Sequence, residues 1–554
     1  MFSTKVKVGG VGPVQRPEAL ILFDAPYQDE IYKGGLMQGR AGVELAKMLH
    51  EAGYLVTECR FESVAQSPFS ADRCEVVFPS SQKKAKAMGA VSWMGKSVHP
   101  DMIPLMENVH KRIANSNPAV IIPVGSLALF TLIGETTPTK WRGSQLQKEI
   151  GGVVRNIVPT LNPLTVVRRW DWRWHCVRDL KRALDWTLDD FHIPERDYKI
   201  NPSFPEACYW LNNLQALLHD EVNVTVDIET RYKQISCISF STNKASAFCI
   251  PIMSVLKPEG YWSESQEFVL VKLMKLILED PNCLVCGQNF SYDYYYLASC
   301  WGIKANVVHD TMVAQHVLWP GTTRALDFLS SIYCSYHRYW KDEGKGYHDG
   351  VSTVEEELEY WEYNDKDSVV THEVRENIIP LLKAKGLYAQ YRILMDRFHR
   401  VNKVVLKGTK IDLALRNRYR LELMDAIAVR ENRLYDLIGH SINLQSPKQL
   451  QTLFYTDFDQ KVVKNRKTGR VTTDKTALAV IAKREPLLAP VCQAIEEVRS
   501  LQVFLGTFVN AELDSDGRIR CTYNIAGPET FRYSSNENPM GTGTNLQNIP
   551  AGRE

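Results

Sequence analysis

The sequence predicts a multidomain protein of the α/β and α+β classes, and three observations lead to this prediction. The chain has 554 residues, 44% hydrophobic and 23% charged, which is an ordinary globular composition and enough for about three domains. Up to about residue 194, short apolar runs alternate with helical patterns, as in α/β domains. A strand with alternating acids then lies near residue 227, and from about residue 385 the pattern becomes helical.

Charge and cysteine content narrow the class of protein. Lys plus Arg (66) nearly balance Asp plus Glu (64), so a nucleic-acid surface would have to be local. The 12 cysteines are scattered and no signal-peptide pattern is present, which indicates reduced thiols and a cytoplasmic location. The longest apolar run, residues 119–134, is interrupted by Pro123 and Gly125 and is too short to span a bilayer. We therefore expect no membrane association.

Two strand–turn–helix units are predicted in the first 194 residues. The apolar stretches 20–24 and 120–124 read as strands, each followed by a glycine-containing turn and then by a helix, at 43–52 and 126–133 respectively. A turn of this kind can cradle an anion, but it is also ordinary α/β construction. The pattern alone predicts no more than a phosphate or base pocket.

An aromatic and basic cluster follows at residues 168–174. Arg168 and Arg169 precede three tryptophans, Trp170, Trp172 and Trp174. Such a cluster can contact phosphates and stack on bases. The alternative, which we favour, is that the tryptophans lie in the core, because aromatic residues mostly serve burial.

A strand with two acids marks the middle of the chain. In residues 224–230, β-branched residues bracket Asp227 and Glu229, which alternate with an apolar residue. Side chains two apart on a strand point to the same face, so the two carboxylates would lie side by side and repel unless a cation sat between them. For a lone Asp-x-Glu pair, solvated acids at a sheet edge are the alternative interpretation.

Two further motifs follow in order. After the apolar stretch 283–286, whose two cysteines we interpret as core thiols, Asn289 and Asp293 are four residues apart, which predicts one face of a helix. Tyr363 and Asp367 repeat this spacing in a helical segment rich in Glu. Three acids and an oriented Tyr suit a two-metal phosphodiesterase, in which oxygen ligands hold hard cations. An exposed helix face at residues 355–367 is the alternative.

The ordered set of motifs resembles the DEDD exonucleases, tyrosine subtype, as in the proofreading domain of family A DNA polymerases. This resemblance implies a ribonuclease H-like exonuclease domain that acts on single-stranded 3′ ends with two Mg²⁺ or Mn²⁺ ions. It further implies that Asp227, Glu229, Asp293 and Asp367 bind the metals, that Tyr363 orients the attacking water, and that Asn289 contacts DNA.

The first 194 residues resemble the uracil-DNA glycosylase superfamily, especially its family 4 branch. The similar stretches are 24–26 with 39–42, 57–60, 118–129, 142–143 and 158–163. That family usually has Glu where this chain has Asp24, and His where it has Asn162; no cysteine precedes Cys59. We therefore expect a glycosylase-like α/β/α fold, without an iron–sulfur cluster because the early cysteines are missing. We expect this domain to serve DNA binding or replisome contact, because Asn162 supplies neither the charge nor the proton of the family's His.

The last third of the chain resembles family A polymerases. Residues 443–454 and 472–475 are similar to the thumb, and 530–535 and 545–550 are similar to the segment that leads into the palm. The resemblance implies primer–template contacts by Arg532, Asn545 and Gln547. Between the two thumb stretches lies a basic loop, which would grip DNA phosphates or would simply be a solvated charge run. Its members are Lys461, Lys464, Arg466, Lys467 and Arg470.

The sequence therefore predicts a glycosylase-like domain at 1–194, an exonuclease domain at 195–385, and a polymerase thumb with the start of a palm at 386–554. Residues 326–333 and 339–342 resemble phage-type enzymes, so a bacteriophage source and a bacterial host cytoplasm are expected. Primer–template DNA is the expected partner, together with a replisome helicase or primase. A stand-alone exonuclease and a non-catalytic DNA-holding subunit are the alternatives.

The expected polymerase would be split. The family's catalytic palm carboxylates are absent from these 554 residues, so we expect a second chain to supply palm and fingers. Apolar palm-entry residues 519–525 would then lack the sheet they should join. A chain shortened in cloning, or a gene interrupted by an intervening element, is the competing explanation.

Overall fold

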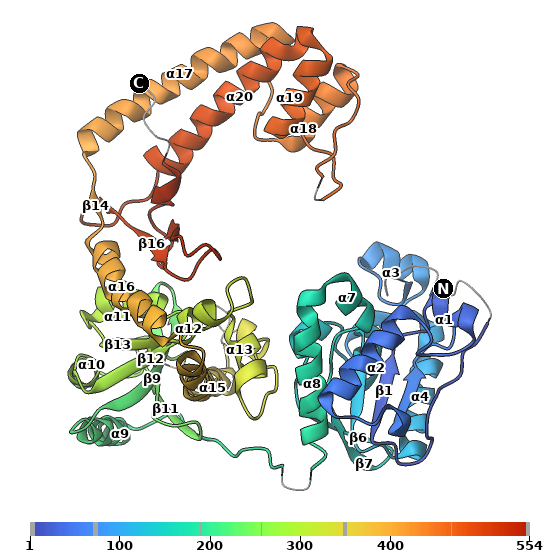
Figure 1. The fold of residues 1–554 in the computed structure, drawn as a ribbon. Coiled ribbons are helices and arrows are strands. Elements are labelled where there is room, and N and C mark those ends of the chain that lie inside the picture. The colour runs from blue at the N-terminus through green and yellow to red at the C-terminus, as the bar shows by residue number, and fades with distance from the viewer. Residues whose placement is uncertain are drawn as a thin grey trace. The chain divides into compact units, whose positions relative to one another are not determined.

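The computed structural model describes residues 6–69, 76–188, 191–255, 257–346, 352–466 and 468–549 (Figure 1). The chain divides into two compact units. The first consists of Met1–Phe290 with Ala305–Tyr391, and the second of Ser291–Lys304 with Arg392–Glu554. The predicted domain boundaries at residues 194 and 385 stay predictions.

A five-stranded sheet organises the N-terminal part of the first unit. Its strand order is β2-β1-β5-β7-β6, in which β6 runs antiparallel to β7 and the other pairings are parallel. The strands are β1 (Ala19–Phe23), β2 (Cys59–Ser63), β5 (Ile121–Val124), β6 (Leu146–Ile150) and β7 (Val153–Ile157). A separate hairpin pairs β3 (Val91–Trp93) with β4 (Lys96–Val98).

Helices cover both faces of this sheet. Ala19, Ile21 and Phe23 of β1 pack into one core with α2 and α8, whereas Leu20 and Leu22 pack into a second core with α4 and α5. Alternate residues of a buried strand face opposite sides, so every position of β1 is apolar. The helices are α1 (Gln28–Lys33), α2 (Arg40–Ala52), α3 (Gln82–Met88), α4 (Ile103–Ser116), α5 (Ser126–Ile133), α6 (Pro138–Trp141), α7 (Pro163–Arg168) and α8 (Arg173–Asp185), with short turns η1 (Val56–Glu58), η3 (Pro100–Met102) and η4 (Trp170–Trp172). The three layers agree with the predicted α/β/α arrangement, while the glycosylase assignment stays a prediction.

A six-stranded mixed sheet organises the rest of the first unit. Its order is β13-β12-β9-β10-β11-β8, with β9, β10 and β11 antiparallel to one another and β12 parallel to β9. The strands are β8 (Asp197–Lys199), β9 (Val222–Arg231), β10 (Gln234–Ser241), β11 (Ser246–Pro251), β12 (Cys283–Gly287) and β13 (Val307–Asp310). The predicted strand at 224–230 is confirmed, and Cys283 and Cys286 are buried as expected.

One long helix, α15 (Val354–Ala384), packs across β9, β10 and β11. It begins at a capping box in which Thr353 Oγ1 accepts a hydrogen bond from Glu356 N, and three acids in its first turn match the helix dipole. The other helices of this part are α9 (Phe204–Leu217), α10 (Glu264–Leu278), α12 (Thr311–Leu318) and α13 (Leu326–Tyr333), with the turn η5 (Glu343–Gly346). Helix α16 (Tyr388–Lys407) begins in the first unit and continues into the second.

The second unit is mainly helical, as predicted. Helices α17 (Leu413–Ile438) and α20 (Ala489–Phe504) lie side by side, and a core that includes Leu434 and Ile495 joins them to α18 and α19 (Figure 1). Its other elements are α11 (Ser291–Trp301), α18 (Pro447–Thr452), η6 (Leu453–Asp457), α19 (Lys475–Arg484), η7 (Pro486–Leu488), η8 (Leu505–Val509), η9 (Leu546–Asn548), β14 (Thr409–Lys410), β15 (Arg518–Ile519), β16 (Cys521–Asn524) and β17 (Ser534–Glu537).

The expectation that residues 519–525 lack a sheet is wrong. Strand β15 pairs with β14, and β16 pairs with β17, so this stretch forms two small antiparallel sheets within the unit. Ile519 and Ile525 are buried there, which removes the apolar surface that was expected to be free. None of the helices in the described part of the chain combines the length and the apolar character that crossing a bilayer requires.

Candidate metal centre and candidate DNA-contact residues

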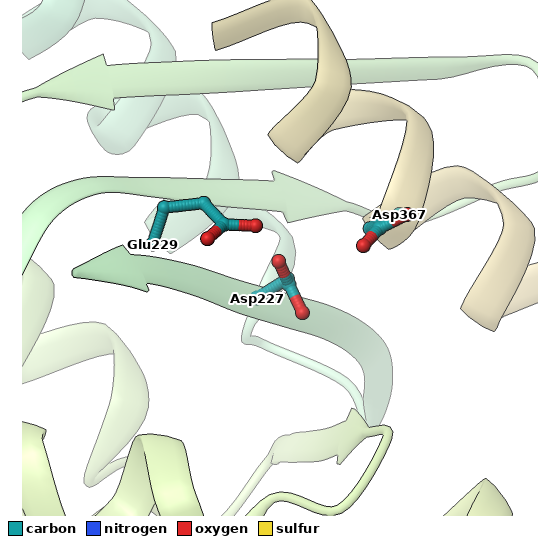
Figure 2. A group of neighbouring side chains, drawn as sticks. All are labelled: Asp227, Glu229 and Asp367. Atoms are coloured by element: carbon teal, nitrogen blue, oxygen red, sulfur yellow. The ribbon is translucent and has the colours of Figure 1, made fainter. Parts of the chain in front are cut away.

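Three carboxylates meet where β9 faces α15. Asp227 and Glu229 project from β9, and Asp367 projects from α15, with one oxygen of each lying within 4.8 Å of the others (Figure 2). The register explains the meeting, because α15 packs across both β9 and its neighbour β10: Asp227 pairs with Ser239 of β10, whose Oγ donates to the Asn364 carbonyl of α15 at 3.0 Å. The structure thus brings the two strand acids close to one helical acid, and their role as metal ligands stays a prediction.

The burial of these carboxylates argues against the two alternative interpretations, which were solvated acids at a sheet edge and an exposed helix face. Asp227 and Glu229 are half-buried and pair with Ser239 and Cys237 of β10, so they are not fully solvated acids. Asp367 is only 4% exposed, so the face of α15 that carries it is not a solvated one. Three carboxylates close together in a partly buried site repel one another, and a hard cation bound by oxygen relieves that repulsion. The donor set therefore fits a divalent metal ion.

Three side chains that the sequence interpretation did not single out orient these carboxylates. Asn364 Nδ2 donates to Asp227 Oδ2 at 2.8 Å, and Trp340 Nε1 donates to Asp367 Oδ1 at 2.7 Å. Lys341 Nζ donates to the other oxygen, Oδ2, of Asp367. The sequence offered only their positions as a signal: Asn364 follows Tyr363 directly, and Trp340 and Lys341 lie in the stretch 339–342 that the sequence analysis singled out.

Tyr363 lies beside the cluster. Its hydroxyl accepts a hydrogen bond from Lys341 Nζ at 2.9 Å, and its ring packs where Gly344 leaves no room for a side chain, since a Cβ there would lie 2.7 Å from the ring. Burial raises the pKa of Tyr363 above its usual range, and the charge of Asp367 raises it further. The phenol therefore stays protonated at neutral pH and can donate a hydrogen bond.

Lys341 supplies positive charge to the cluster. Burial alone would lower its pKa, but the charge of Asp367, with smaller contributions from Asp227 and Glu229, raises the pKa overall. The ammonium therefore stays protonated at neutral pH and offsets part of the carboxylate charge. It does so from the side of Asp367, where it contacts Oδ2.

The prediction that Asn289 and Asp293 share one helix face is wrong. Helix α11 begins at Ser291, and Asn289 lies before it with φ of +57°, a left-handed conformation that Asn tolerates. Asp310 fixes this turn, because its carboxylate accepts from Asn289 N at 3.2 Å and from Phe290 N at 2.9 Å. Asp293 lies on α11 and is buried, and its role as a metal ligand stays a prediction.

A cavity with a basic lining adjoins Trp340. Its volume is about 250 Å³, and Arg196, Arg338 and Lys366 line it. Arg196 pairs with Glu373 at 2.9 Å and Lys366 pairs with Glu343 at 2.8 Å, which leaves Arg338 as an exposed cation at its rim. An excess of positive charge at this place fits an anionic strand.

At the two glycine turns of the N-terminal sheet, a carboxylate of the chain contacts the N-terminus of the helix that follows. Asp24 Oδ1 accepts from Ala128 N of α5 at 2.8 Å, and Asp29 Oδ2 accepts from Arg40 N of α2 at 3.1 Å. At each helix end, one of the chain's own carboxylates thus takes a donor that a phosphate could use. The phosphate or base pocket stays a prediction.

Asn162 is committed to local structure. Its Oδ1 accepts from Leu164 N at 2.9 Å as the N-cap of α7, and it also accepts the hydroxyl of Tyr27. Burial, with the nearby charge of Asp24 as a second cause, raises the pKa of Tyr27 above its usual range. Residue 162 is therefore a hydrogen-bonded amide, which is neutral at any ordinary pH.

The favoured core interpretation of the tryptophans is wrong for two of the three. Trp170 is 62% exposed and Trp174 is 49% exposed, whereas Trp172 is partly buried against the first core. Trp319, at the end of α12, is 42% exposed and its ring lies 6.3 Å from that of Trp174. Arg168 and Arg169 are exposed beside them, with Arg169 paired to Asp171. The burial argument failed because Trp170 lies in the turn η4 and Trp174 in the first turn of α8, and both positions are exposed.

The basic loop of the second unit is a small hairpin. A bridge joins Lys464 to Val471, and Asn465 N donates to the Arg470 carbonyl at 2.8 Å. The side chains of Lys464, Arg466 and Arg470 are exposed, which agrees both with phosphate binding and with a solvated run. Lys467 lies outside the described residues.

The palm-entry residues differ in their exposure and in the hydrogen bonds that their side chains already make. Arg532 and Gln547 are exposed. Asn545 caps η9 instead, because its Oδ1 accepts from Gln547 N at 3.0 Å and from Ser535 Oγ. The DNA contacts proposed for these three residues stay predictions, and only the amide nitrogen of Asn545 remains available for one.

Two segments of the chain match known protein families. Residues 202–383 match the 3'-5' exonuclease family, and this range includes the three clustered carboxylates, Asp293 and Tyr363. Residues 414–554 match DNA polymerase family A. These two matches support a likeness to the family A DNA polymerases. The recognition made from the motifs is thereby confirmed for these segments.

The curated relatives of this chain are longer than the part of them that it matches. DNA polymerase I of Pseudomonas aeruginosa is 28% identical over 355 residues, which cover 62% of this chain and 38% of the relative. DNA polymerase I of Rhizobium leguminosarum is 28% identical and covers 50% and 27%, and that of Mycobacterium leprae is 36% identical and covers 26% and 16%. The chain thus spans well under half the length of these relatives.

Among solved structures, the POL domain of Pol1 from M. smegmatis, in complex with DNA primer-template and dNTP, is similar with a TM-score of 0.47 and 22% identity. The match covers 65% of this chain and 57% of that one.

Proposed function

We propose that this chain removes nucleotides from the 3′ end of DNA by two-metal hydrolysis, as the proofreading part of a family A DNA polymerase in replication. One observation carries the proposal. Asp227, Glu229 and Asp367 bring their oxygens within 4.8 Å of one another inside the segment that matches the 3'-5' exonuclease family. Hydrolysis of a phosphodiester needs such a group of hard oxygen ligands.

Each residue has a distinct task in this reaction. The three carboxylates would hold Mg²⁺ or Mn²⁺, with Asp293 as a further ligand, and the ions supply an activated water and charge stabilisation at the phosphate. Asn364 and Trp340 keep the carboxylates of Asp227 and Asp367 oriented. The protonated hydroxyl of Tyr363 donates a hydrogen bond that orients the attacking water.

The test is digestion of a 5′-labelled single-stranded oligonucleotide with Mg²⁺. Asp227→Ala with Glu229→Ala is expected to lower the rate by at least about 1,000-fold, since lost ligands remove several kcal/mol of transition-state stabilisation. A matched control is Asp220→Ala with Glu221→Ala, which removes two exposed acids just before β9. Digestion that the Asp227/Glu229 variant retains at the wild-type rate would exclude the proposed site.

A second proposal concerns DNA binding by the second unit. The hairpin that carries Lys464 and Arg466 has the exposed positive charge that phosphate contacts require, and it lies within the family A match. Lys464→Ala with Arg466→Ala should weaken primer–template binding and lower the slope of log K against log salt by about 2. Lys244→Ala with Lys272→Ala, the same charge change on exposed lysines of the first unit, should leave that slope unchanged. An unchanged slope in the hairpin variant would instead support a solvated charge run.

The alternatives differ in what they leave unexplained. A non-catalytic DNA-holding subunit gives no reason for the clustered carboxylates, and the digestion assay decides this question. A stand-alone exonuclease gives no reason for the segment at 414–554 that matches DNA polymerase family A. The separate palm-and-fingers chain stays a prediction, as do the bacteriophage source and the replisome partners.

A further inference from the structure

The segment 331–342 connects the N-terminal sheet with the candidate metal centre. At its far end, Trp340 and Lys341 donate hydrogen bonds to the two oxygens of Asp367. Both contacts depend on where the backbone of this segment runs, because the segment has no regular secondary structure between α13 and η5. An irregular segment needs partners for its backbone groups to keep one course.

Those partners come from the loop 140–145 of the N-terminal part, which comprises the last two residues of α6 and the four residues before β6. Gln145 makes two contacts with His337: its backbone N donates to the His337 carbonyl at 2.7 Å, and its Oε1 accepts from His337 N at 3.2 Å. Ser144 Oγ accepts from Tyr339 N at 3.1 Å. Ser144 and Gln145 are both buried, so these bonds are shielded from competing water.

The same loop reaches the end of the segment. Lys140 Nζ lies 3.1 Å from Asp342 Oδ2, just after Lys341. This contact is partly exposed, and the Trp141 ring meets the Tyr339 ring edge to face at 5.3 Å beside it. The loop thus contacts three positions that bracket Trp340 and Lys341.

Two arginines of the N-terminal part hold the beginning of the segment. Arg142 NH1 donates to Ser331 Oγ at 2.9 Å, and Arg182 NH2 donates to the carbonyls of Ser331 and Cys334 at 3.1 and 2.8 Å. Asp179 holds Arg142 in place from α8 through two charged hydrogen bonds. The N-terminal part therefore contacts the segment at both of its ends.

We propose that the loop 140–145 of the N-terminal part positions the metal centre of the exonuclease part through this segment. Ser144 and Gln145 are positioning residues: they fix the backbone of 337–339, which aims Trp340 and Lys341 at the carboxylate of Asp367. The proposal rests on the proposed function, because it assumes that Asp367 is a metal ligand. It assigns the N-terminal part a task in hydrolysis that needs no base excision.

Loosening the segment should weaken metal binding. A ligating carboxylate that loses its orienting hydrogen bonds typically binds metal 10- to 100-fold more weakly. Gln145→Leu removes the acceptor of His337 N at nearly constant volume. We expect its Kd for Mn²⁺, measured by calorimetry on the full chain, to rise about 10-fold, with the same relative rise in the Mn²⁺ concentration for half-maximal digestion.

Two comparisons separate positioning from general destabilisation. Gln145→Glu keeps a side-chain oxygen for His337 N and should retain most of the Mn²⁺ affinity. Gln147→Leu makes the same substitution at an exposed position of β6, two residues away, and should leave the affinity unchanged. Each variant is also compared with the wild type by thermal unfolding.

A charge exchange covers the case in which Gln145→Leu does not fold. Lys140→Asp and Asp342→Lys should each weaken Mn²⁺ binding by a few-fold, and the double exchange should restore it, because the pair is then re-formed with opposite polarity. Equal Mn²⁺ affinity in Gln145→Leu, or with that variant unfolded no change in either single exchange, would overturn the proposal. If the wild type neither binds Mn²⁺ nor digests DNA, the proposed function has failed instead.

Discussion

Replacing Arg142 by Met is expected to destabilise the first unit strongly. Arg142 and Asp179 are 2% and 1% exposed, and the guanidinium donates to both carboxylate oxygens. With Arg142 removed, the hydroxyl of Thr160, at 2.8 Å, is the side-chain donor that Asp179 keeps among the described residues. A buried carboxylate that loses its cation costs about 3 to 5 kcal/mol, although protonation limits that cost, because burial already raises the pKa of Asp179.

Urea unfolding followed by tryptophan fluorescence measures this loss. All 12 tryptophans except Trp301 belong to the first unit, so the signal reports that unit. The unfolding free energy of Arg142→Met should be lower than that of the wild type by about 3 kcal/mol or more.

Two further variants distinguish the cause. Arg142→Met with Asp179→Leu removes both charges and should recover much of the stability, because an apolar pair of similar volume carries no desolvation penalty. Arg169→Ala removes one member of an exposed pair, with Arg169 and Asp171 about 60% exposed, and should leave the unfolding midpoint in place. A loss below about 1 kcal/mol in Arg142→Met would refute the reasoning that this pair is buried and coupled.

Two remaining predictions concern pH and base excision. Burial first, and the charge of Arg142 second, lower the pKa of His175 to about 4. The unfolded chain therefore binds a proton that the folded chain resists, so stability should fall as pH drops from about 6.5 to 4, by up to about 3 kcal/mol for this residue, and His175→Gln should flatten that part of the unfolding curve. Efficient uracil excision is not expected, since Asn162 caps α7 and carries no charge. The assay uses the Asp227/Glu229 variant, which should leave the DNA strand undigested. Formation of abasic sites in uracil-containing DNA over many turnovers would contradict the prediction.

Local sequence patterns were enough to predict the strand and the helix that carry the clustered carboxylates. Strand β9 and helix α15 follow from β-branched alternation and from a capped helical run, and both carry their acids at the predicted numbers. The spacing of four between Asn289 and Asp293 misled, because a left-handed turn held by Asp310 ends the strand before the helix begins. Nothing local in the sequence announces that turn.

Side chains that act across long sequence separations could not be predicted. Trp340 reaches Asp367 over 27 residues, and Gln145 reaches His337 over 192. Single-sequence patterns describe neighbours along a strand or helix, whereas these contacts depend on how an irregular segment is held by a distant loop. The same limit applies to Trp170 and Trp174, whose exposure depends on how η4 and the start of α8 pack rather than on their apolar character.

The central claim is that Asp227, Glu229 and Asp367 hold the ions that hydrolyse DNA. Calorimetric titration with Mn²⁺ tests it most directly, because it counts bound ions without reliance on turnover. The account predicts two ions bound by the wild type and by Asp220→Ala with Glu221→Ala, and loss of this binding in Asp227→Ala with Glu229→Ala. Equal Mn²⁺ binding by the wild type and the Asp227/Glu229 variant would contradict the account.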